Sequence, residues 1–186
     1  LPVNIASEGS PMDERRLERV RENMARRGVE QALIVDPLSI WWLCGYYTEP
    51  YERFLALYVP AEGEPTLFAN RLFLDASGCG ARVMSFSDTD DPVPLVAGVT
   101  AADRPLGVDK ELAACWLVPL MEARAATGFV LASDVVDDAR SVKDAREQEL
   151  MRRASATNDA AMSWLVEQVR PGVTEREIAD GLLGVY

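Results

Sequence analysis

Histidine, the side chain used most often as a general base and as a metal ligand, is absent from the 186 residues of this chain. Without it, Ser-His and Cys-His nucleophile pairs and most zinc sites are excluded. Ser141 and Lys143 are one residue too close together for an S-x-x-K site, and Gly78-Cys-Gly80 lacks the third glycine of a dinucleotide-binding loop. We therefore predict that this chain contains no catalytic residue and no metal ligand.

An acidic turn, Asp88-Thr-Asp90-Asp91, offers oxygen ligands of the kind that calcium prefers. An EF-hand loop would need glycine at its sixth position and glutamate at its twelfth, where this sequence has Val93 and Val99. The turn is therefore predicted to face solvent without binding an ion.

The cysteines Cys44, Cys79 and Cys115 are widely spaced and form no C-x-x-C motif. This spacing encodes neither a disulfide framework nor a zinc knuckle. Because free cysteine is among the most frequently buried residue types, we predict that all three are buried thiols.

Aromatic residues are concentrated between positions 41 and 58. Four that lie in or beside expected elements are predicted to pack in the core: Trp41, Trp42, Phe54 and Tyr58. Tyr46, Tyr47 and Tyr51 instead share an expected loop with Arg53. Tyrosine and arginine give a loop a large contact area with polar tips, so this loop is predicted to be either an interface or pocket wall, or simple packing.

The composition indicates a soluble globular protein, with 48% hydrophobic and 26% charged residues. A formal net charge of −11 opposes binding to nucleic acid or to anionic lipid surfaces. The sequence shows no apolar run long enough to span a bilayer and no signal peptide at its start. We therefore expect a cytoplasmic protein that binds neither nucleic acid nor membrane.

Apolar periodicity and turn signals predict alternating helices and strands. The expected helices cover residues 11–27 (capped by Ser10), 38–43, 70–76, 111–127 and 144–169, with a short one from Pro92 and another from Thr174. The expected strands cover residues 32–35, 54–59, 66–69, 81–86, 105–108 and 128–131, and 54–59 forms a hairpin with 66–69. This order predicts an α/β fold, a mixed β-sheet flanked by helices, over residues 1–139.

A polar, charged stretch over residues 134–143 precedes the long expected helix, and we place the domain boundary there, between residues 139 and 140. Thr174 and Glu177 form a capping box that starts a further helix, whose apolar side finds no partner in the remaining sequence. We therefore expect residues 140–186 to be the truncated start of a second domain.

Two segments resemble a known family. Arg140 to Ala154 (RSVKDAREQELMRRA) resembles the R-x-x-K-x-x-x-E-[IL]-x-x-x-[RK]-x-A stretch that opens the catalytic domain of creatinase/prolidase-type proteins. Arg170 to Ile178 (RPGVTEREI) is similar to the turn and helix start, xPGxTExEI, that follows in that family. Upstream, residues 16–28, 32–35, 39–45 and 106–109 resemble the family's N-terminal domain in order.

The resemblance implies an N-terminal α/β domain with a ribonuclease H-like motif, followed by the start of a pita-bread metallopeptidase domain. It implies that the parent is an Xaa-Pro dipeptidase or aminopeptidase P-like enzyme, which hydrolyses the peptide bond preceding proline in short peptides. The parent would hold two divalent metal ions, with manganese expected, and form a homodimer. The metal ligands of the family lie after the helix that begins near Thr174, so no cofactor is expected in this chain.

The same resemblance leaves two alternatives, a protein-binding module from a catalytically silent relative and the N-terminal domain of a creatine amidinohydrolase. In dimeric members the N-terminal domain leans over the active site of the neighbouring subunit. The loop from Tyr46 to Arg53 matches the region that can make such contacts. We therefore expect Tyr47, Tyr51 and Arg53 to form a substrate-cavity wall or a dimer contact, and expect this domain to be non-catalytic.

Overall fold

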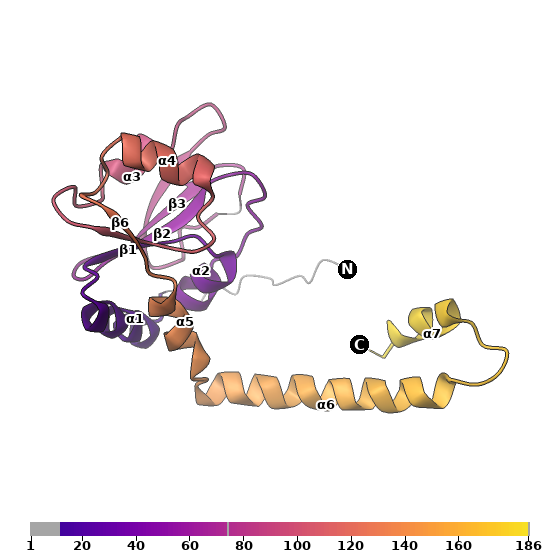
Figure 1. Ribbon diagram of the computed structural model, residues 1–186. Helices are drawn as coiled ribbons and strands as arrows, with labels where there is room; N and C mark the ends of the chain where they lie inside the picture. The colour runs from indigo at the N-terminus through magenta and orange to yellow at the C-terminus, as the bar shows by residue number, and fades with distance from the viewer. Residues whose placement is uncertain (1–11, 74, 186) are drawn as a thin grey trace. The chain divides into compact units, whose positions relative to one another are not determined.

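The computed structural model describes residues 12–73 and 75–185 of the chain (Figure 1). Two compact units divide the chain, of which the first ends at Ser141 and the second begins at Val142. The first unit contains a β-sheet with helices on both faces, and the second contains two helices.

Within the described residues, the strands of the first unit are β1 (Gln31–Ile34), β2 (Leu55–Pro60), β3 (Thr66–Asn70), β4 (Arg82–Phe86), β5 (Leu106–Val108) and β6 (Phe129–Leu131). They form one sheet in the order β4-β3-β2-β1-β5-β6. β2 is antiparallel to both β1 and β3, whereas β3 and β4, β1 and β5, and β5 and β6 are parallel pairs. The predicted mixed sheet and its hairpin are therefore confirmed.

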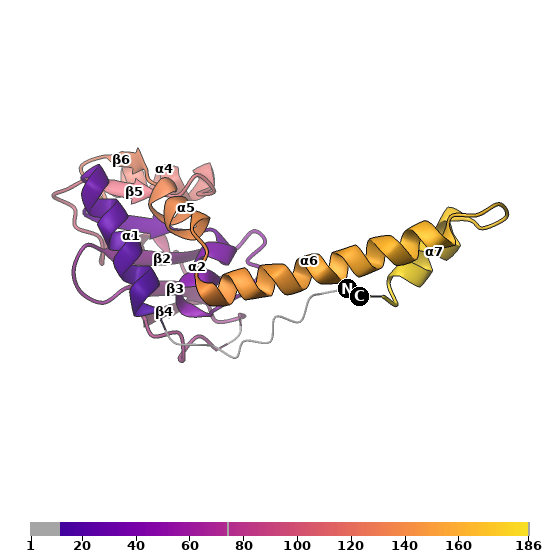
Figure 2. The ribbon, with the colours of Figure 1, turned by 90° about the horizontal axis from the view of Figure 1, so that it is seen from below.

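The helices of the first unit are α1 (Glu14–Arg27), α2 (Pro37–Cys44), α3 (Val93–Ala97), α4 (Ala114–Glu122) and α5 (Asp134–Ser141). α1, α2 and α5 cover one face of the sheet, and α3 and α4 cover the other (Figure 1). Figure 2 shows α1 and α5 side by side on their face. Because both faces are covered, all four residues of β1 are buried, including the polar Gln31 at its start.

Two apolar cores fill the space between the sheet and its helices. Under α1, Leu17, Val20 and Met24 are buried at helical spacing against the first core. On the opposite face, the Phe54 ring contacts the Phe68 ring with 6.5 Å between centroids, in the tilted geometry that aromatic pairs favour. The cores therefore hold the strand ends and the loops that follow them in fixed positions.

α1 begins at a different cap from the predicted one. The Asp13 side chain accepts hydrogen bonds from the backbone N–H groups of Arg15 and Arg16, both at 3.1 Å, and so satisfies two of the free donors at this helix end. The predicted cap, Ser10, lies outside the described residues. The helix ends as predicted at Gly28, which has φ +67°.

Two further expectations about helices were wrong. The described residues after Asn70, which ends β3, form no helix up to residue 76, because the Asn70 side chain accepts a hydrogen bond from the Leu72 N–H and closes a local turn. Residues 134–141, expected to be a polar connection, form α5, which buries Val135, Val136 and Ala139 against the sheet. The helix expected over residues 111–127 is present as α4, but it covers only Ala114–Glu122.

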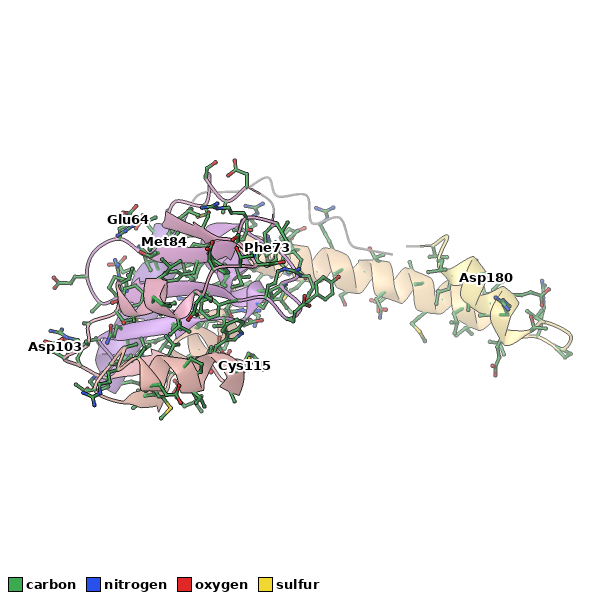
Figure 3. All side chains as sticks on the ribbon, turned by 90° about the horizontal axis from the view of Figure 1, so that it is seen from above. Glu64, Phe73, Met84, Asp103, Cys115 and Asp180 are labelled. Atoms are coloured by element: carbon green, nitrogen blue, oxygen red, sulfur yellow. The ribbon has the colours of Figure 1, made fainter. Side chains whose placement is uncertain are left out.

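Most of the predicted core aromatics and cysteines are buried, with two exceptions. Trp42, Phe54 and Tyr58 are buried, but the Trp41 side chain, on the outer side of α2, is 41% exposed. Cys44 and Cys79 are buried, whereas Cys115 is exposed on α4 (Figure 3). Both exposed side chains lie on the outer side of their helix, because consecutive residues of a helix are rotated by about 100° from one another and only part of its surface faces the core.

The second unit consists of α6 (Ala145–Gln168) and α7 (Glu175–Leu182). Each helix starts with a capping box, at Asp144 and at the predicted Thr174. Gly181 lies against the Trp164 ring, leaving no room there for a larger side chain. Among the helices of the described residues, none has the length and apolar character needed to cross a membrane.

Candidate functional site

A cavity of about 390 Å³ lies at the carboxyl ends of the parallel strands β1, β5 and β6. Asp36 follows β1, Asp109 follows β5 and Ser133 follows β6, so polar residues from three strand ends meet there. This edge of a sheet is where α/β proteins preferentially bind ligands. The lining residues are Val35, Asp36, Pro37, Ser39, Glu49, Pro50, Asp109, Lys110, Glu111, Ser133, Val136, Asp137 and Arg140.

Asp109 joins the three strand ends. Its Oδ2 accepts hydrogen bonds from the backbone N–H groups of Val35, at 3.3 Å, and Asp36, at 3.2 Å. Its Oδ1 accepts from the Glu111 N–H at 3.1 Å and from the Ser133 hydroxyl at 3.2 Å. A nearly buried carboxylate with this many donors is fully satisfied, so it braces the loops around the cavity.

Asp36 and Arg140 form an ion pair on a second side of the cavity. Arg140 Nη1 lies 3.0 Å from Asp36 Oδ2 and donates to Ser39 Oγ at 2.8 Å. Asp36 also caps α2 by accepting from the backbone N–H groups of Leu38 and Ser39. Burial raises the pKa of Asp36, but the hydrogen bonds from Ser39 and Leu38 and the charge of Arg140 outweigh it and lower that pKa below its ordinary value.

Two further charged residues of the cavity, Lys110 and Asp137, are also paired. Lys110 Nζ lies 2.6 Å from Asp137 Oδ2, and this hydrogen bond raises the pKa of Lys110. The Ser39 hydroxyl donates to Asp36 and the Ser133 hydroxyl donates to Asp109, so both hydroxyl protons are engaged within the cavity wall. Among the described residues, no group of three or more His, Cys, Asp or Glu is placed to hold a metal ion. The paired side chains can therefore hold the loops around the cavity in place or make polar contacts with a bound group.

The loop that holds the predicted site residues borders this cavity, because Glu49 and Pro50 line it. Tyr47 is half-buried and its hydroxyl donates to Glu49 Oε2 at 3.3 Å. Burial, followed by the charges of Glu49 and Tyr51, raises the pKa of Tyr47. Tyr51 is 80% exposed and has φ +52°, in the left-handed region. Tyr47 and Tyr51 are therefore near each other beside the cavity.

Arg53 is engaged elsewhere. Its guanidinium makes a two-pronged contact with Asp88, with Nε to Oδ1 at 2.9 Å and Nη2 to Oδ2 at 3.0 Å. Asp88 also accepts from the Asn70 amide at 2.8 Å, and the hydrogen bond from Arg53 lowers the pKa of Asp88. Arg53 thus ties the end of the loop from Tyr46 to Arg53, called the aromatic loop below, to the turn after β4. Its guanidinium does not pair with Asp36 in the cavity.

The sequence prediction omitted the residues that form the cavity. Asp36, which directly follows the expected strand over residues 32–35, is not among the predicted site residues, and Asp109 and Arg140 enter only as parts of segments that resemble the family. A usable signal existed, because Asp36 and Asp109 each follow a buried apolar run directly. The part played by Tyr47, Tyr51 and Arg53 as cavity wall or dimer contact stays a prediction.

The family model described as Creatinase/Prolidase N-terminal domain matches residues 16–142. The probable dipeptidase PepE of Mycobacterium tuberculosis is 33% identical over 172 residues, which cover 89% of this chain and 46% of that protein. The chain therefore spans about half the length of the curated relatives it matches.

Two solved structures resemble nearly the whole chain. The dipeptidase PepE from Mycobacterium ulcerans matches with a TM-score of 0.79 and 30% identity, over 95% of this chain and 50% of that one. A recombinant prolidase from Thermococcus sibiricus matches with a TM-score of 0.81 and 22% identity, over the same shares of 95% and 50%. The second likeness is one of fold alone.

Proposed function

The chain belongs to the creatinase/prolidase N-terminal domain family, and we propose that it is the non-catalytic N-terminal domain of an Xaa-Pro dipeptidase-like metallopeptidase. In this proposal the parent protein hydrolyses the peptide bond preceding proline in short peptides. The domain contributes to dimerisation and to the shape of the substrate cavity. The similarity to dipeptidases over nearly the whole chain supports this proposal.

The hydrolytic step is assigned to residues outside this chain. The two divalent ions expected of such a parent, with manganese as the expected metal, have no fitting donor set here, because the sequence lacks histidine and no ligand cluster occurs among the described residues. No step of the reaction is therefore derived for the cavity residues. Their paired charges instead hold the loops that border the cavity.

The observation that carries the contact role is Tyr51. An L-residue in the left-handed region costs roughly 1–2 kcal/mol, and glycine or asparagine would occupy that position at lower cost. The ring gains little from packing within this chain, since it is 80% exposed. Strained, exposed aromatic residues at loop tips are typical of contact surfaces. Leu38 and Trp41, three residues apart on α2 just before the loop, are two further exposed apolar side chains.

The test uses the full-length protein that contains this chain, with two separate variants. Tyr51→Asn removes the ring and keeps a residue type that tolerates positive φ, and Arg53→Ala releases the loop from Asp88. We expect each variant either to lower kcat/KM for an Xaa-Pro dipeptide about tenfold, equivalent to ~1.4 kcal/mol, or to dissociate the dimer in light scattering.

Arg104→Ala is the matched control, because Arg104 is also a surface arginine paired with two carboxylates, Glu30 and Asp103, away from the aromatic loop. It should change neither turnover nor mass. If Tyr51→Asn and Arg53→Ala both match the control in mass and in kcat/KM, the contact role is wrong.

A further inference from the structure

Two cysteines meet inside the core that α1, α2 and α5 cover. Cys44 is the last residue of α2 and Cys79 lies in the loop before β4, and their side chains are 0% and 4% exposed. Both belong to the same apolar cluster, and each thiol lies close enough to the other to shift its pKa. Two free thiols in contact form the geometry from which a disulfide is made by a short movement.

The backbone holds the two thiols in this arrangement through one shared segment. The Met12 N–H donates to the Cys79 carbonyl at 3.0 Å, and the adjacent Asp13 N–H donates to the Leu43 carbonyl at 2.8 Å. The loop with Cys79 and the end of α2 are thus both anchored to the same two residues. The pairing is therefore a fixed feature of the fold and does not depend on side-chain rotation alone.

The two thiols are not equivalent. Cys79 lies between the exposed glycines Gly78 and Gly80, so a small opening of its loop brings solvent to the sulfur. Cys44 lies deeper and its Sγ donates to the Ile40 carbonyl at 3.2 Å. The neighbouring Cys44 thiol lowers the pKa of Cys79, whereas the neighbouring Cys79 and burial raise the pKa of Cys44.

We propose that Cys44 and Cys79 form an oxidisable dithiol, which a peroxide converts into an intramolecular disulfide. The Cys79 thiolate attacks one peroxide oxygen, the O–O bond breaks, and a sulfenic acid forms as the other oxygen leaves as water after protonation. The Cys44 sulfur then attacks the Cys79 sulfur, its proton goes to the leaving hydroxide, and a second water departs. The two thiols lose two protons and two electrons in total, and the peroxide is reduced to two waters.

The disulfide would fix the end of α2 to the loop before β4. α2 supplies Pro37 and Ser39 to the cavity and leads through Gly45 into the aromatic loop. Oxidation would therefore restrict the segment from which that loop starts. The proposal does not depend on the peptidase assignment, because it concerns only groups within this chain.

The experiment uses the full chain with Cys115→Ser, which removes the exposed third thiol and leaves two. The folded protein is treated with hydrogen peroxide, denatured, and assayed for free thiols and by mass spectrometry. We expect the two thiols to fall to none, a peptide linking Cys44 to Cys79, and a monomer lighter by two hydrogens. The rate should not depend on protein concentration and should rise with pH, because the attacking species is the Cys79 thiolate.

A second variant, Cys44→Ala with Cys115→Ser, should stop at a Cys79 sulfenic acid that dimedone traps. Should that variant fail to fold, the linked peptide in the first protein still decides the question. In the unsubstituted chain, Cys115 is the internal control for a lone exposed thiol. Reaction of Cys115 alone, with Cys44 and Cys79 still reduced, overturns the proposal, and so do disulfides found only between molecules.

Discussion

At the scale of single residues, Gln31 is the most heavily bonded polar side chain of the sheet. It is 1% exposed, and its amide nitrogen lies within 2.9 to 3.3 Å of the carbonyls of Ala101, Arg104 and Pro105. Its oxygen accepts from the Ala101 N–H at 2.8 Å and from the Tyr58 hydroxyl at 3.1 Å. A buried polar group is tolerated here because every one of its hydrogen-bonding positions is used.

Gln31→Leu should lower the free energy of unfolding by about 2–4 kcal/mol, because it leaves the buried Tyr58 hydroxyl and the Ala101 N–H without their partner. Urea denaturation followed by circular dichroism measures this. Adding Tyr58→Phe removes one of the stranded groups and should restore part of the loss. A Gln31→Leu protein as stable as the original would show that this network contributes nothing.

The sequence predicted the apolar residues of the core well. It predicted less well which polar residues lie next to one another in the folded chain. The buried stripe of α1 is readable from helical spacing alone, whereas the meeting of Asp36, Asp109 and Arg140 depends on strand order. Trp41 shows a related limit, because a short apolar helix carries no polar face to reveal its outer side. The cavity therefore became visible only in three dimensions.

At the scale of elements, β5 packs unusually closely against its surroundings at Gly107. A Cβ atom there would lie 2.7 Å from the Ala132 Cβ, 2.9 Å from a Val29 methyl and 3.2 Å from the Gln31 carbonyl oxygen. Two of these distances are below any normal contact, and the neighbours are held in the core. The register of β5 between β1 and β6 thus requires glycine at this position.

Gly107→Ala should destabilise the first unit by about 1–3 kcal/mol through overpacking. Gly128→Ala is the matched control, because a Cβ at Gly128, just before β6, meets nothing within 4 Å. The control should be neutral or more stable by roughly 0.4–1 kcal/mol. Thermal unfolding of both variants measures the difference, and equal midpoints would contradict this account of the packing.

Helices were predicted correctly from the local sequence where a helix-capping motif or a clear apolar repeat was present. The long α6 and the α7 start at Thr174 were predicted because a capping box and an apolar repeat mark them. α5 was missed because Asp134, Asp137 and Asp138 dominate its composition, and its buried stripe is visible only against α1. In the segment after β3, the Asn70 turn prevailed over a helical pattern.

At the scale of the whole molecule, alternation of helices and strands predicted the α/β class and the β2–β3 hairpin. The strand order, with β1 between β2 and β5, was not predicted, because nothing in a single sequence states which parallel strands become neighbours. The assignment of residues 140–186 to the start of a pita-bread domain stays a prediction. Family membership rests on residues 16–142.

The central claim, that this chain is the non-catalytic domain of an Xaa-Pro metallopeptidase, is tested by one comparison. Hydrolysis of an Xaa-Pro dipeptide is measured with added Mn²⁺ for this chain alone and for the full-length protein that contains it. We predict turnover by the full-length protein and none by the chain. Turnover by the chain alone, or an inert full-length protein that instead binds a partner protein, would contradict the claim.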